Sequence, residues 1–291
     1  MEIYETTGGM AGEEGLFEIE EWLRWERKRA RTRRRTQEDR KVEEYVFDIP
    51  TLECLYKLAK RRIITAMGGP VSTGKEANVF HALSDKSVTG MKEIAVKIYK
   101  IETSTFDAMH EYIIGDPRFE NIKKNKRSMV FAWTKKEFRN LKRAADAGVR
   151  VPKPVAADRN VLVMEFIGVD GVPEPLLREV ANDIDKADAK RIFKDLVSYM
   201  RLLYNGARLV HADLSEFNIM AEGYIECENI RPVLIDFGQA VLLSHPNAEA
   251  FLRRDVRNVA TFFKKLSVQC SEDEILRLVE NGGRKETGRG R

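Results

Sequence analysis

Two short segments of the chain carry side chains that could act together on a phosphate group. In HADLSEFN, the carboxylate of Asp213 is followed five residues later by the carboxamide of Asn218. In VLIDFG, an apolar run ends at the carboxylate of Asp236, eighteen residues after Asn218. Phosphoryl transfer needs a base for the attacking hydroxyl and oxygen ligands for divalent cations. We therefore predict Asp213 as the catalytic base, and Asn218 and Asp236 as ligands of Mg²⁺ or Mn²⁺.

A lysine stands in an apolar stretch, EIAVKIYK, well before these segments. Ile94, Val96 and Ile98 alternate with the residues between them, which predicts a strand. Lys97 occupies the place in the motif order where a lysine binds the α- and β-phosphates of ATP, and we predict this role for it. The alternative is a lysine that extends from a strand edge to solvent.

The segment GGPVSTGKEANVFHAL before this strand allows two interpretations. Gly69 to Lys75 fits most of a Walker A loop, G-x-x-x-x-G-K. However, Glu76 replaces the Ser or Thr that would bind magnesium, and NVFHAL has the pattern of a strand where a helix is required. We reject the Walker interpretation.

The second interpretation is a hairpin that covers a nucleotide. Aligned on G-x-G-x-x-G-x-V, the segment retains the middle glycine and the valine and replaces the outer glycines by Ser72 and Ala77. The hydroxyls of the loop could donate to the phosphates beside the backbone N–H groups. The predicted nucleotide contacts are Val71, Ser72, Thr73, Gly74, Lys75 and Val79.

A lysine in this role needs a carboxylate partner on a following helix. Residues 103–127 are polar and predict an insertion, and helical spacing of apolar residues predicts a helix that begins at Thr134. Glu137 is the predicted partner of the lysine. Thr134 and Glu137 also fit a capping box, which would turn the glutamate back onto its own helix. Glu111 and Glu120 are the other candidates.

Further elements are predicted to position these groups. VPKPVAA and NVLVMEFIG predict two strands, and the end of the second could bind adenine through a hinge formed by Met164, Glu165, Phe166 and Ile167. An amphipathic helix over 188–205, stopped by Gly206, leads to the Asp213 loop. His211 is predicted to brace this loop, and so is Asp255, on a helix that follows; a surface carboxylate is the alternative for Asp255.

Composition predicts a protein of one large domain or two lobes with an extension. The chain has 291 residues and three cysteines, Cys54, Cys227 and Cys270, without metal-ligand or redox spacing. An odd cysteine count fits a reducing compartment, and the sequence shows neither a signal-like start nor an apolar stretch of membrane-spanning length. We expect a cytoplasmic protein with no membrane partner.

The net charge of +4 is unevenly distributed. Residues 24–41 hold ten Lys or Arg against three acids, and a second basic cluster, GGRKETGRGR, ends the sequence. Both could contact the phosphates of RNA, although a solvated charged helix or tail explains them equally well. Segment 16–42 could form a charged helix, and Phe17, Trp22, Leu23 and Trp25 could dock it on another surface.

A change of composition at Pro50 suggests a domain boundary just before a helix with Thr51 as its N-cap. The predicted organisation is a charged extension at 1–48, an N-terminal lobe at 49–167, a C-terminal lobe at 168–275 and a basic tail at 276–291.

The order of these motifs resembles that of a protein kinase. The strings STGKEANVF, MEFIG, HADLSEFN, LIDFGQAV and FLRRDVRN resemble the RIO family of atypical protein kinases, and within it the archaeal members of the type-one branch. The resemblance covers residues from about 50 to 270. It implies an α+β, two-lobed protein-kinase-like fold, with an antiparallel sheet and a helix in the N-lobe and a mainly helical C-lobe. It also implies an ATP-dependent serine kinase or ATPase that matures the small ribosomal subunit, with Asp236 as a transient phosphate acceptor.

The sequence departs from ordinary protein kinases in two respects. Ser215 stands where serine/threonine kinases usually have a lysine, and no APE motif follows DFG, so a full activation segment and a peptide-binding subdomain are not expected. Autophosphorylation or ATP hydrolysis would fit such a site. Two other functions stay open: a small-molecule phosphotransferase, disfavoured by the short portion after DFG, and an RNA- or pre-ribosome-binding protein that uses ATP as a latch.

Overall fold

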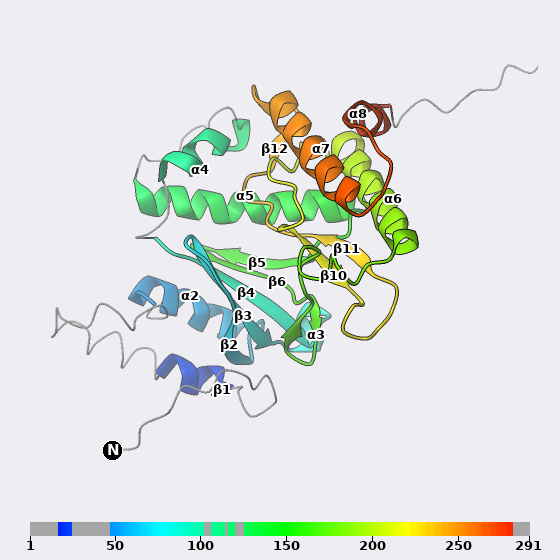
Figure 1. The fold of residues 1–291 in the computed structure, drawn as a ribbon. Helices are drawn as coiled ribbons and strands as arrows, with labels where there is room; N and C mark the ends of the chain where they lie inside the picture. The colour runs from blue at the N-terminus through cyan, green and yellow to red at the C-terminus, as the bar shows by residue number, and fades with distance from the viewer. Residues whose placement is uncertain (1–16, 25–46, 102–105, 114–115, 120–124, 282–291) are drawn as a thin grey trace, which may run out of the picture. The chain divides into compact units, whose positions relative to one another are not determined.

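The computed structural model describes residues 17–24, 47–101, 106–113, 116–119 and 125–281 (Figure 1). Contacts divide the chain into unit 1, which comprises Met1–Ser104 and Val155–Pro173, and unit 2, which comprises Thr105–Pro154 and Glu174–Arg291. This division assigns the helix that carries Glu137 to unit 2, whereas the sequence suggested the N-terminal lobe.

Unit 1 is built on a six-stranded sheet with the order β1-β2-β3-β4-β6-β5. The strands are β1 (Phe17–Glu18), β2 (Ala66–Thr73), β3 (Ala77–Leu83), β4 (Glu93–Tyr99), β5 (Pro154–Asp158) and β6 (Val161–Glu165). The pairs β1–β2, β2–β3, β3–β4 and β4–β6 are antiparallel. The predicted hairpin and strands are confirmed, and NVFHAL is the strand that the Walker interpretation could not accommodate.

Helix α2 (Ile49–Lys60) lies beside this sheet (Figure 1). Its Leu52 and Leu55 are buried in one core cluster with sheet residues such as Phe80 and Val96. The predicted N-cap, Thr51, is wrong, because the Asp48 carboxylate accepts a hydrogen bond from the Thr51 N–H at 2.9 Å and so caps the helix. A short helix, α3 (Lys86–Thr89), and a hairpin of β7 (Gly168–Val169) with β8 (Val172–Pro173) complete the unit.

The described part of the N-terminal extension packs on this core. Residues 19–24 are helical, and Trp22 and Leu23 are buried, with the Trp22 ring 5.5 Å from that of Phe47. Docking of these two side chains is therefore confirmed. Residues 25–46, which include Trp25 and most of the basic segment, lie outside the described residues, as does the basic cluster at 282–291.

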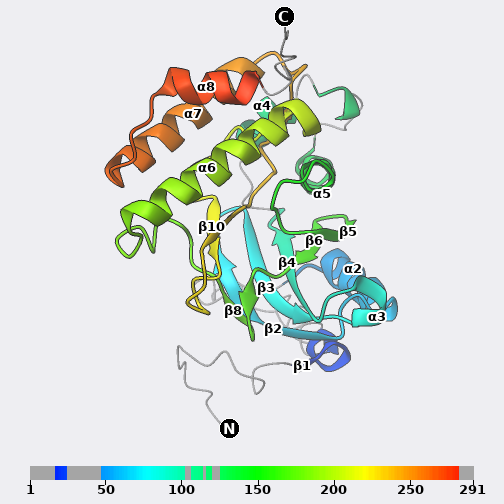
Figure 2. The same ribbon diagram turned by 90° about the vertical axis from the view of Figure 1, so that its right-hand side faces the viewer.

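Unit 2 consists of helices and two short antiparallel ladders. The helices are α4 (Phe106–Ile113), the 3₁₀ turn Pro117–Phe119, α5 (Lys126–Asp146), α6 (Lys186–Leu202), the π-helical turn Leu203–Ala207, α7 (Ala248–Lys265) and α8 (Glu272–Glu280). Helices α6, α7 and α8 lie side by side (Figure 2). The ladders pair β9 (Leu209–Val210) with β12 (Val241–Leu242), and β10 (Ile219–Glu222) with β11 (Arg231–Leu234).

Helix α5 begins earlier than its sequence predicts. The predicted start at Thr134 is wrong, since the helix begins at Lys126 with Asn125 as its N-cap. Met129, Val130 and Trp133 are buried at helical spacing within the stretch that precedes the predicted start. The Thr134 hydroxyl donates to the Val130 carbonyl one turn earlier, at 2.9 Å, so the capping-box interpretation of Glu137 is wrong as well.

Helix α6 also ends differently from the prediction. Gly206, which was predicted to end the helix, lies inside the π-helical turn instead. The turn ends at Arg208, which has the left-handed conformation. After Gly238 the chain passes directly into β12 and then into α7 at Ala248, so the expected absence of a long activation segment holds for this described stretch. None of the described helices is both long and apolar enough to cross a bilayer.

Candidate active site

The two short ladders of unit 2 position the segments that carry the predicted catalytic groups. The Asp213 loop connects β9 to β10, and the Asp236 turn connects β11 to β12. In the β10–β11 ladder Ile219 pairs with Leu234, and the Ile235 N–H donates to the Asn218 carbonyl at 3.0 Å. The ladder therefore sets Asn218 opposite the residue that precedes Asp236.

The side chain of Asn218 is oriented by Asp213. Its Nδ2 donates to Oδ2 of Asp213 at 3.0 Å and to the Asp213 main-chain carbonyl at 2.8 Å. Because the nitrogen is used in these bonds, the amide oxygen is the atom left for a cation. An amide oxygen and a carboxylate suit Mg²⁺, which usually takes one or two protein oxygens and completes its octahedron with phosphate and water oxygens. The donor set formed by Asn218 and Asp236 fits this ion.

Three side chains of α7 hold the main chain on both sides of Asp213. The Asp255 carboxylate accepts from the Ala212 N–H at 2.8 Å and from the Leu214 N–H at 2.9 Å. The Arg254 guanidinium donates to the Ala212 carbonyl, and Asn258 Nδ2 donates to the Leu214 carbonyl at 3.0 Å. Both residues that flank Asp213 thus have their N–H and their C=O hydrogen-bonded by α7, which fixes the backbone around the predicted base.

Asp255 is buried, and the predicted brace is confirmed. Burial raises the pKa of its carboxyl to about 7, although the two backbone N–H donors act in the opposite direction. Arg254 and Asn258 were not identified from the sequence as parts of the brace. Their spacing of one residue before and three after Asp255, on a helix whose other face is apolar, is the signal that could have found them.

His211 braces the loop from its other end, as predicted. Its Nε2 lies 3.0 Å from the Ile235 carbonyl, and its ring packs edge-on against Phe237 at 4.7 Å. Nδ1 is buried without a hydrogen-bond partner, which fits a neutral ring with its proton on Nε2. Burial lowers the pKa of His211 to about 4, so at neutral pH this side chain is an uncharged structural link.

In unit 1 the sheet register places the predicted lysine and valine opposite each other. Lys97 on β4 pairs with Val79 on β3 and with Leu162 on β6, and Ala95 pairs with Met164. Paired residues share a face of the sheet, so Val79, Lys97 and Met164 lie on the face opposite to the core packed beneath α2. Strand β4 is paired on both sides and Lys97 is buried, which excludes a lysine at a sheet edge.

The other predicted nucleotide contacts form the tip of the β2–β3 hairpin and the end of β6. Gly74 closes the tip by donating its N–H to the Ala77 carbonyl at 2.9 Å. The tip residues Ser72, Thr73, Gly74 and Lys75 are exposed, whereas Val71 is partly buried. Met164 and Glu165 end β6 and are partly buried, and Phe166 and Ile167 are buried.

A hydrogen-bond network of unit 1 lies next to Phe166 and was not predicted from the sequence. The Glu93 carboxylate accepts from the Gly171 N–H and contacts Nε2 of His81, both at 2.8 Å. The His81 ring lies 4.8 Å from that of Phe166. Gly171 has φ +77°, and a Cβ there would lie 3.3 Å from the His81 ring, so the β7–β8 turn is fitted closely to the strand.

Comparisons with known proteins identify the family of this chain. The family model described as the RIO domain matches residues 78–275. The RIO-type serine/threonine-protein kinase Rio1 of Haloferax volcanii is 48% identical over 251 residues, which cover 86% of this chain and 81% of that protein. The chain belongs to the RIO family. The Rio1 of Methanocaldococcus jannaschii is 39% identical over 242 residues, covering 83% of this chain and 78% of that protein.

Among solved structures, the chain is similar to the Rio2 kinase of Chaetomium thermophilum, in an ADP/Mg²⁺-phosphoaspartate complex. The two share 21% sequence identity and a TM-score of 0.60, over 86% of this chain and 72% of that one. This likeness confirms the kinase-like α+β fold. The relatives place the chain in the RIO1 branch, whose members are serine/threonine-protein kinases, so this RIO protein is an enzyme of that class.

The structure locates the predicted site residues of this RIO protein in two groups. Asp213 and Asn218 are bonded to each other in unit 2, where Asn218 also accepts a hydrogen bond from Ile235, the residue before Asp236. Lys97 belongs to unit 1 and Glu137, which is fully buried on α5, to unit 2, so their ion pair stays a prediction. Glu111 lies exposed on α4, and Glu120 is outside the described residues.

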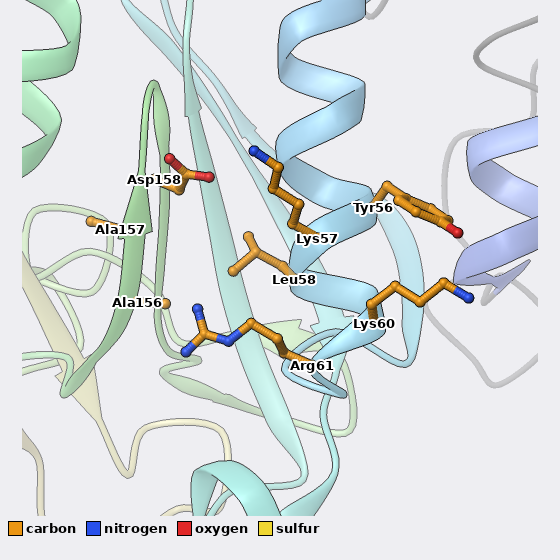
Figure 3. Close-up of a pocket in the computed structure, with 8 residues that line it drawn as sticks. All are labelled: Tyr56, Lys57, Leu58, Lys60, Arg61, Ala156, Ala157 and Asp158. Atoms are coloured by element: carbon orange, nitrogen blue, oxygen red, sulfur yellow. The ribbon is translucent and has the colours of Figure 1, made fainter.

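One pocket of unit 1 contains no predicted site residue (Figure 3). It has a volume of about 440 Å³ and lies between α2 and β5. Lys57, Lys60 and Arg61 contribute three cations to its lining, against the single carboxylate of Asp158. The remaining lining residues are Tyr56, Leu58, Ala156 and Ala157.

Proposed function

We propose that this RIO kinase transfers the γ-phosphoryl group of ATP to a serine hydroxyl, with autophosphorylation as one outcome. The observation that carries the proposal is the bonding of Asp213, whose carboxylate receives the Asn218 amide and whose neighbours are both clamped by α7. A carboxylate fixed in this way can accept a proton in a defined direction, as a general base requires.

The proposed reaction assigns a role to each predicted group. The acceptor oxygen forms the new bond to phosphorus, its proton passes to Asp213, and the bond between the γ-phosphorus and the bridging oxygen breaks to release ADP. Asn218 and Asp236 hold Mg²⁺ or Mn²⁺, which would neutralise charge on the phosphates. Lys97, paired with Glu137, binds the α- and β-phosphates.

The remaining predicted contacts bind the rest of ATP. The hairpin tip, from Val71 to Lys75, covers the phosphates, and Val79 contacts the nucleotide from the strand. Residues 164–167 hydrogen-bond the adenine through their backbone. Asp236 is also proposed as a transient phosphate acceptor, because the similar Rio2 structure was solved as a phosphoaspartate complex with ADP and Mg²⁺.

Incubation with labelled ATP and no added acceptor tests this function. The parent protein should become labelled, and Asp213→Ala should reduce the rate by about 10²- to 10⁴-fold, the usual contribution of a positioned base, while ATP still binds. Hydroxylamine should remove label from Asp236 but not from serine. Equal labelling rates in the parent and in Asp213→Ala would refute the assignment, and label found only on an added small molecule would favour a small-molecule phosphotransferase.

A second candidate function is binding of pre-ribosomal RNA of the small subunit, with ATP as a conformational latch. The pocket of Figure 3 favours it, because Lys57 and Lys60 of α2 and its C-cap residue Arg61 line this part of unit 1. The basic segment 24–41 would add phosphate contacts. Binding of a structured RNA should then weaken steeply with salt, and deletion of 24–41 should reduce the slope of log K against log salt. An unchanged slope would show that residues 24–41 do not contact the RNA phosphates.

We also propose that the protein acts in the cytoplasm. Cys54, Cys227 and Cys270 are free thiols, which suits a reducing compartment. Conversion of all three thiols to disulfides or mixed disulfides in protein isolated with rapid alkylation would contradict this location.

A further inference from the structure

The turn that follows Asp236 has main-chain carbonyls that no strand satisfies. Between β11 and β12, residues 235–240 have no regular secondary structure. Two side chains of α5 bind the carbonyls of this turn. Lys136 Nζ donates to the carbonyls of Gly238 at 2.7 Å and Ala240 at 2.5 Å, and Asn140 Nδ2 donates to those of Phe237 at 3.1 Å and Ala240 at 2.8 Å.

These two side chains are completely buried. Burial lowers the pKa of the Lys136 ammonium to about 7, which shows how unfavourable this environment is for a charge. A buried polar group destabilises the fold unless its hydrogen bonds compensate, and apolar residues of similar size would pack at lower cost. Both side chains bind carbonyls of this one turn and share that of Ala240, which indicates that they are retained to hold the turn.

The turn also fits closely against the same helix. A Cβ on Gly238 would lie 2.6 Å from Nε1 of Trp133, so only glycine permits this contact. Lys136 Nζ lies 5.3 Å from the centre of the Trp133 ring. Asp236 itself has φ +62°, in the left-handed region that residues other than glycine adopt uncommonly, although aspartate does so more often than most.

We propose that Lys136 and Asn140 are positioning residues, which keep the Asp236 carboxylate in its metal-binding orientation by holding the carbonyls of residues 237, 238 and 240. The inference rests on the proposed role of Asp236 as a metal ligand. Glu137, the predicted partner of Lys97, directly follows Lys136 on α5. The helix therefore connects Glu137 to the turn that carries Asp236. Displacement of α5 then displaces both groups.

The test measures Mn²⁺ binding to the ADP-bound protein by electron paramagnetic resonance, which does not depend on turnover. Lys136→Met retains the length of the side chain and removes its donors, and Asn140→Ser is a milder change that leaves the lysine in place. Mn²⁺ should bind about tenfold more weakly in Lys136→Met, the factor that one buried hydrogen bond is worth, whereas ADP affinity without metal should not change. Asn140→Ser should also weaken Mn²⁺ binding, but by a smaller factor.

Thr134→Val is the matched control. Thr134 is equally buried on α5, but its hydroxyl bonds only within the helix, so Mn²⁺ affinity should stay at the parent value. Asp236→Asn separates the two proposals: if it leaves Mn²⁺ affinity unchanged, the assigned metal ligand is wrong. If Asp236→Asn weakens Mn²⁺ binding but folded Lys136→Met or Asn140→Ser binds it like the parent, the positioning role is refuted. Should Lys136→Met fail to fold, Asn140→Ser alone decides.

Discussion

Replacement of Asp255 by asparagine should displace the proposed catalytic base, Asp213, without changing that residue itself. In the native protein the two carboxylate oxygens each accept one N–H, from Ala212 and Leu214, the residues on either side of Asp213. Asparagine has the same shape but only one oxygen, so its NH₂ group would face a second N–H. One buried backbone donor loses its partner and a repulsive contact forms.

The magnitude follows from these two bonds. An unsatisfied buried donor costs about 1–3 kcal/mol, so the free energy of unfolding should fall by about 2–3 kcal/mol in Asp255→Asn. The loop would also shift, and a displacement of about 1 Å at a reacting group costs on the order of 100-fold in rate. We expect kcat to fall by about 10- to 100-fold, with little change in the KM for ATP, because Asp255 has no predicted contact with the nucleotide.

Urea unfolding and steady-state phosphoryl transfer, both at about pH 8, measure these effects with the Asp255 carboxyl mostly ionised, since its pKa is raised to about 7. Glu249→Gln is the control: it removes a negative charge from the same helix, but Glu249 is exposed and binds only Arg253, a surface pair that contributes little. A normal kcat in folded Asp255→Asn would refute the claim that α7 positions the base. Equal effects of the two variants would show that charge, not the brace, is responsible.

Two further substitutions test the packing around the site. Burial lowers the pKa of His211 from 6.5 to about 4, so the folded state binds fewer protons than the unfolded state between these values, and the free energy of unfolding falls as pH drops through this window. The full loss for such a shift is about 3 kcal/mol, and His211→Phe should remove this component from urea titrations compared at about pH 7 and 4.5; the same pH dependence in both proteins would contradict a neutral, buried ring. Gly238→Ala should destabilise the protein by about 1–3 kcal/mol in thermal or urea unfolding, because its methyl group would meet Trp133, and unchanged stability would show that this contact is loose.

The sequence predicted those parts of the molecule that depend on local pattern. Alternating apolar residues located β4, and the fixed distances in HADLSEFN located Asp213 and Asn218 without knowledge of the fold. The brace by Asp255 was also predictable, because a carboxylate among the apolar residues of a helix needs a buried donor. Arg254 and Asn258 escaped notice, since a basic or amide residue beside a charged one has the pattern of an exposed helix face.

The start of α5 could not be predicted for a related reason. Its first two turns mix buried Met129, Val130 and Trp133 with polar residues, so the sequence favoured an insertion up to Arg127. That interpretation is wrong for residues 106–113 as well, because they form α4, in which Met109 and Ile113 are buried. Burial of these side chains against the rest of unit 2 outweighs the weak local preference. Helix propensity alone does not reveal which side chains become buried, and so it could not locate the start of α5.

The two segments that carry the predicted catalytic groups share one means of support. Loops between short ladders lack the regular hydrogen bonds of a sheet, so their N–H and C=O groups need partners from elsewhere. Helix α7 supplies them around Asp213 through Arg254, Asp255 and Asn258, and α5 supplies them after Asp236 through Lys136 and Asn140. A buried side chain of a helix whose polar atoms bond to a loop outside that helix therefore holds the loop in place, as Asp255, Lys136 and Asn140 do. By this criterion, the residues that set the geometry of the site lie on helices far from it in sequence, and substitutions there should alter metal binding and turnover before they alter nucleotide affinity.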